Sequence, residues 1–255
     1  MSKLPANTGW LWLKHGFALF RKQPGILTML LFTNFMVSVL LGNIPYIGPL
    51  LAVVLIPSLT MSVLQACYLI EQGERVTPQV MLTGFREPVI KRLCKLGLVY
   101  LGVTIILTAL ASLFIDADFW RRMMTPVDPE KATAADRSTM LTFLGLVMLQ
   151  CLMLLALCFA APLTYWKGMG PGKATFYSFF AVLGAIRPIL LMLCAWFGIF
   201  MGVFIAASLI FGNSSAGKVV IIWLMLLFTL ELQCAFYASY RQIFGDPAAV
   251  DLEKR

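Results

Sequence analysis

The sequence predicts an all-α fold, a polytopic membrane protein with about six transmembrane helices in three hairpins. Of its 255 residues, 60% are hydrophobic and only 13% are charged, and the mean hydropathy is +0.86. Soluble domains carry about 25% charged residues, so this chain has too few charges to cover a water-facing surface. The apolar runs are continuous rather than alternating, which argues against a transmembrane barrel. Despite the net charge of +8, nucleic acid is not an expected partner.

The spans follow from the apolar runs. No charged residue or histidine occurs between Gln23 and Ile70, and this stretch fits two helices because about 20 residues cross a bilayer. Turn-forming residues divide the stretch: Gly42, Asn43, Pro45, Gly48 and Pro49. The six predicted spans are 25–43, 50–70, 93–115, 139–165, 188–212 and 218–239. We therefore divide the chain into a cytoplasmic lead-in at 1–24, a transmembrane domain at 25–240 and a cytoplasmic tail at 241–255.

Residues 8–22 of the lead-in have the periodicity of an amphipathic helix lying on the membrane surface. Four apolar residues share one face of it: Trp10, Leu13, Phe17 and Phe20. Lys14 and Arg21 fall on another face, and Pro24 ends the helix. The simplest interpretation is an anchor for the first span. The single histidine, His15, is predicted to be a polar residue of this helix rather than a catalytic group.

The distribution of basic residues predicts the orientation. Of the 20 Lys and Arg residues, five fall in predicted outer segments: Arg121, Arg122, Lys131, Arg137 and Lys218. The others lie in segments that are cytoplasmic when the N-terminus is cytoplasmic, so both termini are expected on that side. This excess of positive charge attracts anionic headgroups. The lipid bilayer, including anionic lipids on the cytoplasmic side, is therefore an expected partner.

Residue types that carry catalysis or bind metals are scarce. With one histidine, no histidine-based metal cluster is expected, and none of the six cysteines forms a Cys-x-x-Cys pair. The stretch 169–173 lacks the spacing of a phosphate-binding loop and is predicted to be a flexible linker. We predict no catalytic residue, no metal and no cofactor, and therefore a protein that is not an enzyme. A membrane-embedded lipid enzyme, which would need clustered His, Asp or Glu, ranks third among the hypotheses.

Among the polar residues of the predicted spans, Glu231 is the most costly to place inside the bilayer. A charged carboxylate inside a bilayer costs about 2.5–3.5 kcal/mol on insertion scales. It should therefore face the bundle interior, be paired or be protonated, and Lys95, Gln65 and Tyr68 are candidate partners. One interpretation is a proton or cation path, or a site for a polar headgroup. The other is a structural hydrogen bond that fixes helix packing.

Further intramembrane positions complete the candidate set. The polar candidates besides Glu231 are Gln65, Gln233, Asn34 and Lys95. Pro57 and Pro162 are expected to kink their spans. The stretches 64–68 (LQACY) and 232–236 (LQCAF) echo each other at similar depth. Duplication and chance explain this echo about equally well. In the polar outer segment 116–138, Phe119 and Trp120 are either an interfacial anchor or a partner site.

Several stretches carry a resemblance to known proteins. These are 42–49 (GNIPYIGP), Pro57, 71–77 (EQGERVT), 84–86 (GFR) and the lead-in from Gly9 to Pro24. They resemble a family of uncharacterised proteobacterial multi-pass membrane proteins, most clearly over residues 9–95. More distantly, the hairpin plan is similar to the membrane domain of some glycerophosphodiester phosphodiesterases. This chain has no hydrolase domain, so that activity does not carry over. The resemblance implies a six-helix bundle in the bacterial inner membrane.

Two functional hypotheses follow. The first is a non-enzymatic inner-membrane protein that acts through helix and lipid contacts, as an assembly, scaffold or envelope-homeostasis factor with a membrane-protein partner. It rests on the small extramembrane segments and the scarcity of reactive residues. The alternative is a small permease or channel, in which kinked spans and Glu231 surround a polar path.

Overall fold

The computed structural model describes residues 5–115, 134–212 and 214–247, without the side chains of 134–139. Every regular element in these ranges is a helix, so the all-α prediction is confirmed. Six helical segments within them are long and apolar enough to cross a membrane: Pro24–Gly42, Ile47–Glu71, Val89–Phe114, Met140–Trp166, Ile186–Phe211 and Ser215–Phe244. The chain is therefore a multi-pass transmembrane protein, as its composition predicts.

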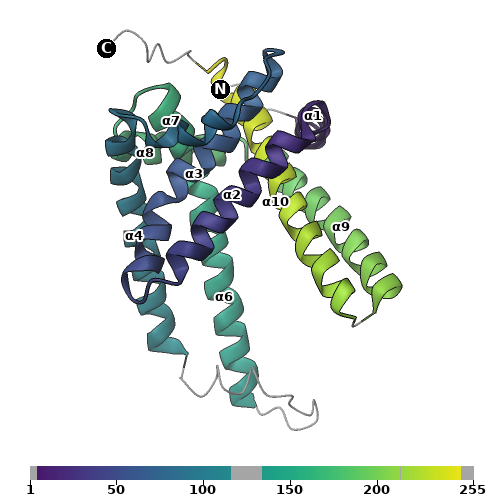
Figure 1. The fold of residues 1–255 in the computed structure, drawn as a ribbon. Helices are drawn as coiled ribbons and strands as arrows, with labels where there is room; N and C mark the ends of the chain where they lie inside the picture. The colour runs from purple at the N-terminus through teal and green to yellow at the C-terminus, as the bar shows by residue number, and fades with distance from the viewer. Residues whose placement is uncertain (1–4, 116–133, 213, 248–255) are drawn as a thin grey trace.

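The long helices extend from one end of the molecule, where shorter helices gather, and they spread apart away from that end (Figure 1). The elements are α1 (Thr8–Lys22), α2 (Pro24–Gly42), α3 (Ile47–Glu71), the 3-10 helix η1 (Pro78–Phe85), α4 (Val89–Phe114), α6 (Ala134–Leu157), α7 (Ala160–Trp166), α8 (Pro171–Gly184), α9 (Ile186–Phe211) and α10 (Ser215–Phe244). Helix α1 lies across the end of the bundle where α7 and α8 are also found (Figure 1). We call this the α1 end, and the opposite end the far end.

The predicted span 139–165 is divided between two helices. Helix α6 ends at Leu157 and α7 begins at Ala160, with Pro162 in the first turn of α7. A proline is tolerated in the first turn, because amides there need no partner within the helix. Neighbouring helices satisfy the backbone at the break. The Tyr100 hydroxyl donates to the Leu157 carbonyl at 2.8 Å. Pro57, in contrast, lies inside α3, which continues to Glu71.

Ser178 of α8 makes two hydrogen bonds at this break. Its hydroxyl donates to the carbonyl of Ala156 at 2.6 Å and accepts the amide of Phe159 at 3.1 Å. We expect Ser178→Ala to lower the free energy of unfolding by about 1–3 kcal/mol, because buried backbone groups lose their partner. Thermal unfolding of the purified protein measures this. Thr175→Ala is the control, because it removes a hydroxyl at a half-buried position of the same helix that bonds only to the Gly172 carbonyl of its own helix. An equal effect of both variants would contradict the assignment.

Helix α8 corrects the sequence analysis, which predicts a flexible linker over 169–173. The helix begins at Pro171, whose fixed backbone angle suits a first helical position. It buries a row of small and medium side chains: Ala174, Ser178, Ala181 and Val182. The glycines and proline near 170 therefore mark the start of a helix. With 14 residues, α8 is shorter than the roughly 20 residues that cross a bilayer.

The buried core lies toward the α1 end. Nearly all buried residues of α3 fall between Pro57 and Ile70, and those of α10 fall between Leu230 and Tyr240, apart from Gly217. Toward the far end, the α9–α10 hairpin diverges from α4 and α6 (Figure 1). Large apolar side chains are exposed there, such as Leu209 at 81% and Ile210 at 76%. In a membrane such surfaces face lipid, whose tails are as apolar as leucine.

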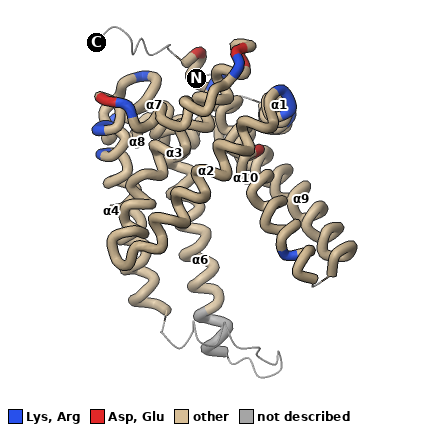
Figure 2. Tube along the Cα trace, viewed as in Figure 1, with Lys and Arg blue, Asp and Glu red and all other residues tan. Residues whose placement is uncertain are grey.

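Charged residues follow the same division. In the described ranges, Lys and Arg gather mainly at the α1 end of the bundle (Figure 2). Lys218, in the first turn of α10, belongs to the far end. The other basic residues that the sequence analysis assigns to outer segments, together with Phe119 and Trp120, lie outside the residues whose side chains the structure describes.

Candidate functional site

Helix α1 packs tightly across α9 and α10. Two glycines make this approach possible, because their neighbours are backbone atoms of the other helices. A Cβ atom on Gly16 would lie 2.7 Å from the Ala235 amide nitrogen, and one on Gly9 would lie 2.0 Å from the Pro188 carbonyl oxygen. Small residues of this kind let membrane helices contact each other through their backbones. The lead-in is therefore an integral part of the bundle.

The buried face of α1 coincides with the predicted apolar face only at Leu13. Trp12, Leu13 and Leu19 are buried, whereas Trp10 and Phe17 are 41% and 49% exposed. The indole nitrogen of Trp12 also donates to the Gln242 side-chain oxygen at 2.5 Å. Apolar residues occur around much of the circumference of α1, so periodicity alone does not select the packed face. The two glycines select it, since Gly9 lets the backbone of α9 come close and Gly16 that of α10.

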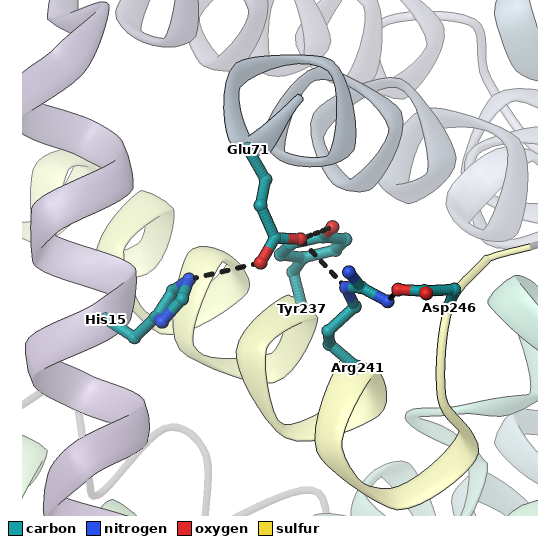
Figure 3. A network of polar contacts seen from close by, with 5 residues as sticks. All are labelled: His15, Glu71, Tyr237, Arg241 and Asp246. Atoms are coloured by element: carbon teal, nitrogen blue, oxygen red, sulfur yellow. Dashed lines mark hydrogen bonds and ion pairs between the residues drawn. The ribbon is translucent and has the colours of Figure 1, made fainter. Parts of the chain in front are cut away.

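A polar cluster joins α1, α3 and α10 at the α1 end (Figure 3). At its centre, Glu71 Oε2 accepts hydrogen bonds from the Tyr237 hydroxyl at 2.5 Å and from Arg241 Nε at 3.0 Å. Glu71 Oε1 lies 3.6 Å from His15 Nε2, an ion pair when the imidazole is protonated. Arg241 also pairs with Asp246. These hydrogen bonds and ion pairs hold together three helices that are far apart in the sequence. We call this cluster the clamp.

The role of Glu71 was not predicted from the sequence, in which it is only the first residue of the stretch 71–77 that follows the second span. One signal was available. Glu71 is the first charged residue after a long apolar run, and Arg241 follows the apolar part of the last span. Both positions are predicted at the same side of the membrane. A carboxylate and a guanidinium at equal depth are natural partners.

The two echoing stretches pack against each other. Cys67 and Cys234 are fully buried, and their sulfur atoms lie 3.4 Å apart. The small side chains in both stretches, including Ala66 and Ala235, allow α3 and α10 to approach closely. The glutamines of the two stretches, Gln65 and Gln233, differ in their hydrogen bonding. Gln65 accepts a hydrogen bond from the Trp166 indole at 2.9 Å, whereas the side-chain oxygen of Gln233 has no partner in the described ranges.

The remaining polar candidates do not converge on one site. The Asn34 side-chain amide donates to the Leu59 carbonyl at 3.0 Å and to the Ser62 hydroxyl at 3.2 Å, which fixes α2 to α3. The side-chain oxygen of Gln233 is buried and has no hydrogen-bond partner within the described ranges. Lys95 is exposed on α4. Among the described residues, no three His, Cys, Asp or Glu side chains are grouped as metal ligands.

Glu231 lines a cavity of about 380 Å³ between α1, α9 and α10. Helix α1 contributes Trp10, Leu13, Lys14, Phe17 and Phe20, and the spans contribute Ile199, Leu227 and Phe228. The Glu231 carboxylate has no hydrogen bond or ion pair with any other described residue. The predicted partners Lys95, Gln65 and Tyr68 do not bind it, because Glu231 lies on the face of α10 that α1 and α9 cover.

Lys14 supplies the second charge of this cavity. Its ammonium lies 5.5 Å from the centre of the Trp10 ring, a distance that permits a cation–π interaction. The cavity thus combines one carboxylate, one ammonium and a lining that is otherwise apolar and largely aromatic. Such a site is suited to binding an amphiphile, since polar groups orient a ligand while apolar walls remove its surface from solvent.

A similar protein carries a name that gives a probable cellular location. It is 29% identical over 261 residues to a probable inner membrane protein of Burkholderia thailandensis, and the alignment covers 98% of this chain and 96% of that protein. No profile of a known protein family matches the chain, and no solved structure matches it. The distant likeness to glycerophosphodiester phosphodiesterases is not supported and stays a resemblance. Over nearly its whole length, this chain is therefore similar to a protein whose name places it in the inner membrane.

Proposed function

We propose that this chain is a non-enzymatic protein of the bacterial inner membrane that binds lipid beneath its N-terminal helix. It acts through helix and lipid contacts, as an assembly, scaffold or envelope-homeostasis factor with a membrane-protein partner. The observation that carries this proposal is the cavity of about 380 Å³ between α1, α9 and α10. Its volume falls within the range of about 300–1,000 Å³ typical of small-molecule sites.

The position of the cavity favours a lipid over a water-soluble ligand. Its walls include the apolar spans α9 and α10, which face hydrocarbon in the membrane. Trp10 and the phenylalanines of α1 border it, and aromatic residues are favoured where headgroups meet acyl chains. An acyl chain can therefore enter along the spans while its headgroup stays beside α1.

The α1 end is proposed to face the cytoplasm. Supporting this, most Lys and Arg residues in the described ranges lie at that end (Figure 2). Basic residues accumulate on the cytoplasmic side of membrane proteins. The name of the Burkholderia thailandensis relative supports the inner membrane as the location. On this basis, the cavity opens toward the inner leaflet, where anionic lipids are also expected near the basic residues of α1.

Lipid retention tests the proposal. We expect the purified wild-type protein to retain phospholipid in native mass spectrometry, and Leu227→Trp to reduce retention about tenfold by filling the cavity, equivalent to about 1.4 kcal/mol. Met225→Trp is the matched control, because Met225 is 52% exposed on the same helix and does not line the cavity. Absence of bound lipid in the wild-type protein, or equal retention by both variants, would overturn the proposal.

A further inference from the structure

We infer that the cavity below α1 selects a phospholipid with a phosphoethanolamine headgroup, whose ammonium binds Glu231 and whose phosphate binds Lys14. This inference deepens the proposed function and rests on it. It begins from the juxtaposition of Glu231 and Lys14, two opposite charges on different helices that line one cavity. Neither α10 nor α1 alone would form this arrangement.

The balance of charge identifies the ligand class. A zwitterionic headgroup offers a cation to Glu231 and an anion to Lys14, so both charges of the cavity gain a partner. An anionic phospholipid would satisfy Lys14 and leave the carboxylate unpaired in an apolar site, which is costly. A lipophilic cation would satisfy Glu231 and oppose Lys14. Only a ligand with both charges compensates both side chains.

Hydrogen bonding then distinguishes between zwitterionic headgroups. The Glu231 carboxylate has no donor within the described ranges, and a primary ammonium brings three N–H donors. Hydrogen bonds between ionised partners are roughly twice as strong as neutral ones. A quaternary ammonium has no N–H and would depend on aromatic rings instead. The face of Trp10 is already covered by the Lys14 ammonium, at 5.5 Å from the ring centre.

The apolar lining accounts for the rest of the lipid. Phe17, Phe20 and Phe228 border the cavity together with two aliphatic side chains of α9 and α10. Phe17 is also 49% exposed, so the lining continues onto the outer surface of the protein. An acyl chain therefore has a continuous apolar path from the cavity along the spans, as insertion from the bilayer requires.

A lipid competition experiment on the full-length protein tests this inference. The protein is equilibrated with equal amounts of phosphatidylethanolamine, phosphatidylcholine and phosphatidylglycerol with identical acyl chains, and bound lipid is identified by native mass spectrometry. We expect a preference of about tenfold for phosphatidylethanolamine over phosphatidylcholine. Glu231→Gln should abolish this preference, and Lys14→Met should weaken all three phospholipids while the preference for a primary ammonium persists. Glu74→Gln, which removes the same charge at an exposed turn, should behave as the wild type.

The outcomes separate this inference from the proposed function. If the wild-type protein retains phospholipid without preferring phosphatidylethanolamine, or if Glu231→Gln keeps the preference, the headgroup assignment is overturned and the lipid-binding function stands. If the wild-type protein retains no phospholipid, both are overturned. The wild-type competition alone decides the assignment in case Glu231→Gln does not fold.

Discussion

Replacing Gly16 with valine is expected to detach α1 from α10 and open the cavity below it. Even a single Cβ at this position would lie 2.7 Å from the Ala235 amide nitrogen and 3.0 Å from its Cα atom. These are backbone atoms that cannot rotate away, so α1 itself must move. Overpacking of this kind costs about 1–3 kcal/mol. Because α1 provides five of the residues that line the cavity, we also expect the loss of bound lipid.

Limited trypsin digestion of the native protein measures this detachment. Cleavage after Lys14 and Arg21 of α1 should become faster in Gly16→Val, because the helix unfolds locally once its packing is lost. Ala18→Val is the matched control, since Ala18 is exposed on the same helix and the change introduces the same residue. If both variants are cleaved at the wild-type rate, the docking of α1 through Gly16 is wrong.

Replacing Glu71 with glutamine is expected to release the clamp between α1, α3 and α10. The variant loses the negative charge of the carboxylate that accepts hydrogen bonds from the Tyr237 hydroxyl and Arg241 Nε. The side chains of Glu71 and Arg241 are only 21% and 29% exposed, so water can only partly replace the hydrogen bonds that are lost. We expect a loss of about 2–4 kcal/mol in the free energy of unfolding, within the range for hydrogen bonds to charged groups and broken buried pairs.

Thermal or denaturant unfolding in detergent measures the effect, with Glu74→Gln as the control in the adjacent exposed turn. A double-mutant cycle gives a sharper test. Because Tyr237 donates to Glu71, Tyr237→Phe should cost much less in the Glu71→Gln background than in the wild type. Additive effects of the two changes would show that the two side chains do not act together.

The sequence predicted the six spans because a bilayer imposes a simple requirement. Each span needs about 20 apolar residues, and such runs are visible in the chain without any knowledge of neighbours. The same reasoning predicted a helix over residues 8–22, and α1 covers Thr8–Lys22. The break near Pro162 also has a local cause, since proline has no amide hydrogen for the preceding turn. These features depend on residues close together in the chain.

The packed face of α1 and the clamp around Glu71 depend on residues far apart in the chain. His15, Glu71 and Arg241 meet only because three helices converge at one end of the bundle (Figure 3). Glu231 shows the same dependence. Its position in an apolar span is evident from the sequence, but the helices that cover it are α1 and α9 rather than those that carry the expected partners Lys95, Gln65 and Tyr68.

Local apolar patterning thus determines how often this chain crosses the membrane, because the energy of burying each segment in lipid depends on that segment alone. Which polar groups meet is decided by tertiary packing, since hydrogen bonds and ion pairs require contact within a few ångströms. The glycines of α1 link the two levels. Nothing in the sequence distinguishes Gly9 and Gly16 from other glycines, and their role in packing is evident only from the backbones of α9 and α10 that lie against them.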